Sequence, residues 1–211
     1  MTQAGTGKKN GDRSKARIPP RIDRDYLYYA GLKYLERYAA SREQFRNVLY
    51  RKIMRSCQYH TDQDEAACRA QADAIVELFT QAGYLDDHRY AHGMVASYRR
   101  KGESRRKISQ RLAEKGVGRD LIETALASYD DTLAEHAGSA GDDETDDEAE
   151  LCAALRYLQR KRFGPFARDP DSEVEQRHYA RLARAGFSFH IARQALHMER
   201  DDAQDRLQAL E

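Results

Sequence analysis

The chain of 211 residues is long enough to bury a hydrophobic core in one large or two small domains. Its 36 Lys and Arg nearly balance its 35 Asp and Glu, which excludes a polyelectrolyte of one sign. The sequence holds 30 Ala and 13 Tyr but only 19 Val, Ile and Thr, a mixture that favours helices over a β-sheet. We therefore expect an all-α protein.

Neither a membrane span nor a secretory signal is visible in the sequence. No apolar run reaches the length of about 18 residues that a span needs. The first 25 residues are polar and basic and lack the apolar stretch of a signal peptide. The three cysteines are too few, and odd in number, for a disulfide framework. We expect a cytoplasmic protein with reduced thiols that does not contact a membrane.

Charge is sorted by position along the chain. Residues 1–60 carry fourteen Lys and Arg against five acids, and residues 86–119 carry ten against four. Residues 130–150 carry ten acids and no Lys or Arg. Because Gly and Ser interrupt this acidic stretch, we expect a solvated linker there. A segment that imitates nucleic-acid charge and folds back on the basic blocks is the alternative.

Helical periodicity begins after a polar start. Residues 1–25 show no periodicity and are predicted to form a disordered basic arm. From Tyr26, apolar residues recur at the three-to-four spacing of one helix face. Ser41 and Gln44 form a capping-box pattern, so a second helix should begin at Arg42. The next apolar periodic stretch predicts a third helix.

The sequence then repeats a helix-and-turn pattern. The sequence of residues 112–117 is similar to that of residues 182–187, and an Ala-Leu pair follows each stretch at the same distance. Residues from Ser41 fit the same frame as those from Ser104. Such fixed-offset similarity is typical of tandem units that stack because one alone cannot bury its apolar face. The pattern predicts an elongated tandem array of three-helix repeats.

The predicted organisation has six segments. In chain order they are a disordered basic arm at 1–25, a first three-helix repeat with an insertion at 26–87, a second repeat at 88–129, an acidic linker at 130–148, a third repeat at 149–198, and a polar C-terminal tail at 199–211.

Two clusters have the side chains of a catalytic or metal site, and neither is complete. The Asp-Asp-His run at 86–88 could share a proton or an ion, but a glycine turn followed by aspartate is typical of a helix end and the next N-cap. Cys57, His60 and Cys68 have zinc-ligating atoms without the paired spacing of a zinc finger. No phosphate-binding loop or serine nucleophile elbow is present. We expect no enzyme activity, cofactor or metal.

Basic residues of the first two units are better candidates for function. In the helix expected from Arg105, the residues Lys107, Arg111 and Lys115 recur at steps of four beside the buried Ile108. Like charges at this spacing repel one another, so they suggest a polyanion or an acidic protein surface as partner. A solvated helix face is the alternative. The candidate binding residues are Arg42, Arg46, Arg51, Lys52, Arg99, Arg100, Lys101, Arg105, Arg106, Lys107, Arg111 and Lys115.

Four stretches, in this order and spacing, carry a resemblance to a known family: 30–42, the Gly-Tyr-Leu-Asp-Asp junction that opens 83–91, the basic turn at 98–102 and the helix at 108–117. They resemble the RecX family of regulators of the RecA recombinase, over about residues 26–198. The resemblance implies an array that lies along the groove of the RecA filament on single-stranded DNA. It implies restraint of ATP hydrolysis, strand exchange and repressor cleavage, without catalytic activity.

The resemblance also implies the partners, which are the RecA filament and the single-stranded DNA within it. We expect a monomer. The same cations would serve a helical protein that binds single-stranded nucleic acid directly. An adaptor would instead bind another protein through aromatic anchors such as Tyr28, Tyr29 or Tyr157. The concentration of Lys and Arg in the first two units disfavours a purely apolar adaptor surface.

Overall fold

The computed structural model describes residues 18–137, 142–167 and 175–209. These residues form ten α-helices and one 3-10 turn, and they contain no strand, which confirms the all-α prediction. The helices are α1 (Arg24–Leu35), α2 (Arg42–Tyr59), α3 (Glu65–Gln81), α4 (Asp87–Arg100), α5 (Arg105–Glu114), α6 (Arg119–Ala137), α7 (Asp142–Lys161), α8 (Glu175–Ala185), α9 (Phe189–His197) and α10 (Arg200–Gln208), and the 3-10 turn is η1 (Gly164–Phe166).

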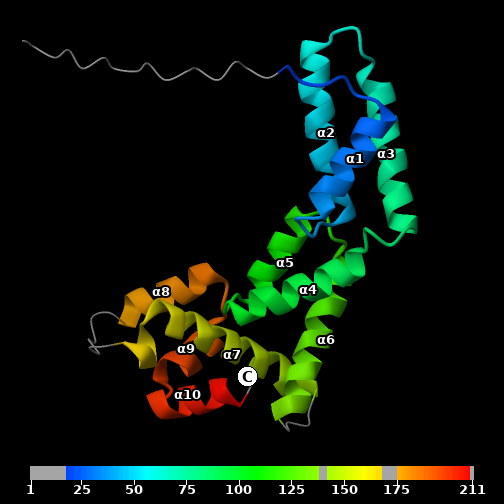
Figure 1. Ribbon diagram of the computed structural model, residues 1–211. Coiled ribbons are helices and arrows are strands. Elements are labelled where there is room, and N and C mark those ends of the chain that lie inside the picture. The colour runs from blue at the N-terminus through cyan, green and yellow to red at the C-terminus, as the bar shows by residue number, and fades with distance from the viewer. Residues whose placement is uncertain (1–17, 138–141, 168–174, 210–211) are drawn as a thin grey trace, which may run out of the picture.

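The helices are arranged as three successive units in a bent array. Figure 1 shows α1–α3 at one end, α4–α6 in the middle and α7–α10 at the other end. Each unit has a separate cluster of buried apolar side chains. A chain built this way buries its core within units, and its overall shape depends on the contacts between them.

The core of the first unit is aromatic. Phe45 of α2 and Phe79 of α3 stack with ring centroids 5.4 Å apart, and both are buried. Gly31 of α1 faces them so closely that a Cβ atom there would lie 2.8 Å from Phe45. The glycine therefore allows α1 to approach the two rings, which is the reason for a helix-weakening residue in the middle of α1.

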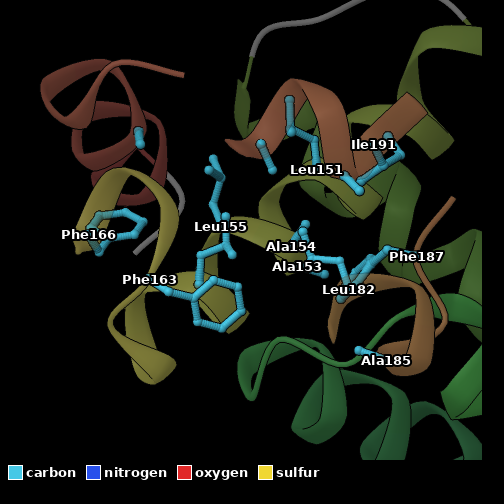
Figure 2. Close-up of a cluster of buried hydrophobic side chains, with 14 of the residues drawn as sticks. Leu151, Ala153, Ala154, Leu155, Phe163, Phe166, Leu182, Ala185, Phe187 and Ile191 are labelled. Atoms are coloured by element: carbon cyan, nitrogen blue, oxygen red, sulfur yellow. The ribbon is translucent and has the colours of Figure 1, made fainter. Parts of the chain in front are cut away.

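The core of the third unit combines side chains from α7, α8, α9 and η1. Figure 2 shows Leu155 beside Phe163, and Leu182 beside Phe187. These residues alternate large rings with aliphatic chains, so the layers interlock. The core of the second unit contains Ile108 and Leu112 of α5 together with Val117 of the following loop. The apolar periodicity in the sequence identified the buried faces of α2, α3 and α5.

One pair of contacts occurs at both junctions between units. Ser41, at the N-cap of α2, accepts a hydrogen bond from the backbone N–H of Gln44 at 3.0 Å and donates its hydroxyl to the carbonyl of Lys115. Ser104, at the N-cap of α5, accepts from the N–H of Lys107 at 3.3 Å and donates to the carbonyl of Ala185 at 2.7 Å. Each serine thus joins the start of one helix to the end of the corresponding helix in the next unit.

A carboxylate and a glycine complete each junction. Asp87 accepts a hydrogen bond from the N–H of Arg42 at 2.8 Å, and Glu150 accepts one from the N–H of Arg105 at 3.0 Å. Gly116 and Gly186 end α5 and α8 in the left-handed region, with φ of +75° and +95°. A Cβ atom on Gly186 would lie 2.5 Å from the Ser104 hydroxyl oxygen. The repeated glycine motif therefore marks the contact surface between units.

The capping box at α2 is only half formed. Ser41 receives the Gln44 backbone N–H as predicted. The Gln44 side chain does not return to the cap, and instead donates to the Tyr34 hydroxyl at 3.1 Å and accepts from the Tyr90 hydroxyl at 3.2 Å. A tertiary contact has replaced the local one, because two tyrosines from neighbouring helices reach this side chain.

Three of the predicted segment boundaries differ from the structure. The range expected to be an acidic linker, 130–148, is helical at 130–137 and at 142–148. Leu133 packs there with Ala149 and Cys152. Composition alone therefore misled the linker prediction, because this acidic sequence still carries an apolar helix face.

Both ends of the array are also more ordered than predicted. The range 199–211 was expected to be a tail, but α10 buries Ala203 and Leu207. Of the expected arm, residues 1–17 lie outside the described residues, whereas Ile22 is buried and exchanges two backbone hydrogen bonds with the Gln63 side chain, at 3.2 and 2.9 Å. The burial of Ile22 and its hydrogen bonds to Gln63 therefore hold the segment before α1 in place.

Gly102 provides a test of the packing between the second and third units. It ends α4 with φ of +71°, and a Cβ atom would lie 2.5 Å from the backbone nitrogen of Tyr157 in α7. We expect Gly102→Ala to destabilise the protein by about 2 to 4 kcal/mol, from strain and overpacking. Urea unfolding followed by circular dichroism measures this. In the matched control, Gly93→Ala, the added methyl meets nothing within 4 Å and should stabilise α4 by about 0.5 to 1 kcal/mol. Equal unfolding midpoints for the two variants would contradict the close approach.

Candidate functional site

One predicted binding residue, Arg99, is a structural residue instead. Its side chain is 1% exposed and contacts Asp130 at 3.1 Å and Glu150 at 2.5 Å. Arg105, half-buried, contacts the same Asp130 at 3.0 Å. These charges link α4, α6 and α7, so they hold the second unit against the third. Arg99 is therefore not available to an outside partner, and a run of cations in sequence did not reveal that one of them points inward.

Three further candidates form ion pairs within the chain. Arg42 contacts Glu77 at 3.1 Å. Arg46 contacts Glu43 at 2.6 Å and Asp73 at 3.0 Å. Arg111 contacts Glu103 at 3.2 Å, and its guanidinium lies 5.2 Å from the centre of the Tyr98 ring. These pairs are partly exposed, and such pairs contribute at most about 1 kcal/mol. A stronger anionic partner could therefore displace them, but they are not free cations.

The remaining candidates have no ion pair with another described residue. Exposed Arg100 and Lys101 end α4, and exposed Arg106 and half-buried Lys107 begin α5. Lys115 follows α5, where its carbonyl, rather than its side chain, makes the contact with the first unit. Arg51 and Lys52 lie on α2, in the first unit. The predicted set thus divides into paired cations, one buried arginine and these unpaired residues.

Lys107 belongs to a cationic hollow that the sequence reasoning missed. A cavity of about 510 Å³ lies between α5, α7 and α8. Four cations line it, namely Lys107, Lys161, Arg181 and Arg184, and no acidic side chain does. The Arg181 guanidinium lies 5.5 Å from the centre of the Phe163 ring, which fixes one wall. Four cations around one cavity repel one another, so the hollow favours an anion such as a phosphate or a carboxylate.

A sequence signal for this hollow existed in the repeats. The frame that aligns 112–117 with 182–187 places Arg181 at the position of Arg111. The prediction followed charge in the first two units only, and so it omitted the cations of α7 and α8. The cations that gather in space come from two units, because the junction brings the start of α5 against the end of α8.

The suspected catalytic and metal clusters have structural roles. Asp86 is the N-cap of α4, and its side chain accepts a hydrogen bond from the backbone N–H of Arg89 at 2.9 Å. This hydrogen bond is the main cause of the lowered pKa of Asp86. The side chain of Asp87 accepts the Arg42 N–H, so it serves the junction. His60 contacts the carbonyl of Pro19 at 2.9 Å. Burial raises the pKa of the Cys68 thiol, which disfavours a nucleophilic thiolate. No group of metal-ligating residues was found among the described residues.

Family models agree with the arrangement of the units. The model of the second three-helix domain of RecX matches residues 86–126, within α4–α6, and that of the third matches residues 148–196, within α7–α9. The regulatory protein RecX of Myxococcus xanthus is 35% identical over 190 residues, which cover 88% of this chain and 93% of that protein. The chain belongs to the RecX family. The regulatory protein RecX of Agrobacterium fabrum is 32% identical over 143 residues, 65% of this chain and 67% of that protein.

Solved RecX structures share the fold. A crystal structure of regulatory protein RecX has a TM-score of 0.56 at 20% identity and covers 82% of this chain and 70% of its own. RecX from Lactobacillus salivarius has a TM-score of 0.51 at 18% identity and covers 88% of this chain and 96% of its own. Among the described residues of this RecX family member, no helix is both long and apolar enough to cross a membrane.

The buried charges at the second junction lead to a stability prediction. We expect Arg99→Met, which keeps the side-chain volume, to cost about 3 to 5 kcal/mol, because it removes the buried cation that pairs with both Asp130 and Glu150. The control is Arg119→Met, which removes an exposed pair with Glu123 and should cost less than about 1 kcal/mol. Thermal and urea unfolding measure both. A small, equal cost for the two variants would mean that the Arg99 cluster does not hold the units together.

Proposed function

We propose that this chain is a negative regulator of the RecA recombinase. It binds the RecA filament on single-stranded DNA and restrains ATP hydrolysis, strand exchange and coprotease activity. Membership of the RecX family supports the proposal, since the relatives carry the name regulatory protein. In this proposal the chain acts as a monomer in the cytoplasm, without a cofactor and without catalysing a reaction.

The cationic hollow is the observation that carries the proposal. Lys107 reaches it from the second unit, and Lys161, Arg181 and Arg184 reach it from the third. A nucleoprotein filament offers DNA phosphates, and charge-assisted hydrogen bonds to phosphate or carboxylate are among the strong ones. Because the hollow has walls from two units, it has this shape only while the junction of Ser104 and Ala185 is intact.

The array explains how binding restrains a filament. Successive units present cations along an extended body, so one chain contacts neighbouring sites of a repeating partner. A ligand that fits one arrangement of subunits better than another shifts the population toward that arrangement. Steps that require the bound subunits to move are therefore slowed, and ATP hydrolysis is the most direct readout.

The test is a titration of this protein against the cognate RecA on single-stranded DNA. The ATPase rate should fall as the protein is added, below one protein per RecA monomer if filament growth is blocked, and nearer saturation if the groove is coated. Lys107→Glu combined with Arg184→Glu should weaken filament binding by about 1 to 3 kcal/mol, or roughly 5- to 150-fold. The salt dependence of binding should become shallower.

The matched control reverses two exposed cations away from the hollow. Arg193→Glu with Arg200→Glu makes the same change in net charge on α9 and α10, and it should leave inhibition within about two-fold of the unmodified protein, since exposed charges are screened beyond about 8 Å. A second comparison, Lys8→Glu with Lys9→Glu, lies outside the described residues and should have the smaller effect. An ATPase unchanged throughout the titration with folded protein would reject the function. An equal loss of inhibition in all variants would show that the interface does not lie at the hollow.

A further inference from the structure

A larger hollow lies on the first unit and is lined by residues of α1, α2 and the segments on either side of α1. Its volume is about 1030 Å³. Four tyrosines line it, namely Tyr26, Tyr29, Tyr34 and Tyr38, and we call it the tyrosine groove. Packing against the core of the first unit accounts for Tyr26 and Tyr34, but not for the other two rings. Two of them are unusually open, since Tyr29 is 67% and Tyr38 57% exposed.

The tyrosine rings at one end of the groove are fixed before anything binds. The Tyr34 hydroxyl accepts a hydrogen bond from the Gln44 side chain at 3.1 Å. The Tyr38 ring leans on Tyr34 with centroids 5.2 Å apart and a tilt of 37°. A tyrosine has few rotatable bonds, so a ring held in this way offers a flat apolar face at a low entropic cost.

Cations accompany the rings, and acids do not. Lys33, Arg37, Lys52 and Arg55 line the groove, and no Asp or Glu does. None of these four has an ion pair with another residue in the part of the chain that the structure describes. The groove therefore combines aromatic faces with uncompensated positive charge, which is how proteins bind nucleic-acid strands with unpaired bases.

The groove continues toward the second unit. Tyr38 also lines a neighbouring hollow of about 420 Å³, together with Tyr84 and Arg89. Tyr84 is 58% exposed. The single acid in that lining, Asp86, is engaged in capping α4. Exposed rings and cations thus follow one another across the first junction, as an extended ligand with repeating bases and phosphates requires.

We propose that the tyrosine groove binds single-stranded nucleic acid, with bases stacked on Tyr29 and Tyr38 and phosphates at the four cations. An acidic peptide would use the cations but leave the exposed rings uncovered, and a duplex hides its base faces within the stack. The proposal concerns a different surface from the cationic hollow. It requires no recombinase and does not depend on the proposed function.

The absence of tryptophan from the sequence allows a direct measurement. Tyr38→Trp places one tryptophan in the groove of the full chain, and circular dichroism checks that the variant is folded. A short oligothymidylate should quench its fluorescence, because a stacked base contacts the indole. An oligonucleotide of equal length with abasic sites keeps the phosphates and should bind about ten-fold more weakly. Polyglutamate should not cause the quenching.

Substitutions test whether binding depends on the tyrosines of the groove or on any exposed tyrosine. Tyr29→Ala should weaken binding of the oligothymidylate about ten-fold, with little effect on binding of the abasic strand. Tyr59→Ala is the control, since Tyr59 is 56% exposed but does not line the groove. It should leave both affinities unchanged. Lys33→Glu with Arg37→Glu should weaken the binding of both strands and make the salt dependence of binding shallower.

Three results would overturn the proposal. The first is indole fluorescence of the Tyr38→Trp variant that oligothymidylate does not quench, and the second is equal affinity for the normal and abasic strands. The third is quenching by polyglutamate equal to that by DNA, which would identify an acidic protein segment as the occupant. All these measurements omit RecA. A failure here therefore leaves the ATPase titration to decide the proposed function, and the reverse is also true.

Discussion

The position of each unit depends on a buried hydroxyl group that serves two helices at once. Ser41 and Ser104 are fully buried, and each completes the N-cap of its own helix while donating to a carbonyl of the following unit. If a hydroxyl is removed, a buried carbonyl and a backbone N–H both lose their partner, which costs more than one net hydrogen bond. The fold within a unit and the angle between units are therefore set by the same atom.

The two junctions differ in their electrostatics. At the second, Arg99, Asp130 and Glu150 form a cluster that is almost fully removed from water. At the first, Arg46 pairs with acids of its own unit on a partly exposed surface. A buried cluster tolerates little change in geometry, since displacement leaves a buried charge unpaired. The second and third units are thus more firmly coupled, and the cationic hollow lies at this firmer junction.

Much of the fold followed from local sequence patterns. The buried stripe of α5, the serine caps and the repeated glycine turns were all visible, because helix periodicity and capping need only neighbouring residues. The burial of Arg99 was not visible, since it depends on Asp130 and Glu150, which are distant in sequence. The helices over 130–137 and 142–148 were missed because the Gly and Ser residues of this acidic stretch favoured a linker.

The candidate site was less predictable for the same physical reason. Lys107 was identified from its helix, but Lys161, Arg181 and Arg184 join it only through the packing of two units. The apolar residues that recur from Tyr26 were expected to share one helix face, and the exposure of Tyr38 in a groove could not be inferred from spacing. A site made of several elements requires the angles between those elements, which no local pattern contains.

The junctions also bear on how such a sequence can diverge. The acceptor in each is a main-chain carbonyl, which every amino acid has, so the residue itself is free to vary. Lys115 and Ala185 hold equivalent places with very different side chains, and Asp87 and Glu150 do so with carboxylates of different length. What mutation has to preserve is a short hydroxyl donor and a glycine next to the acceptor. The same architecture is therefore compatible with extensive sequence drift, and it persists at 18–20% identity in the solved RecX structures.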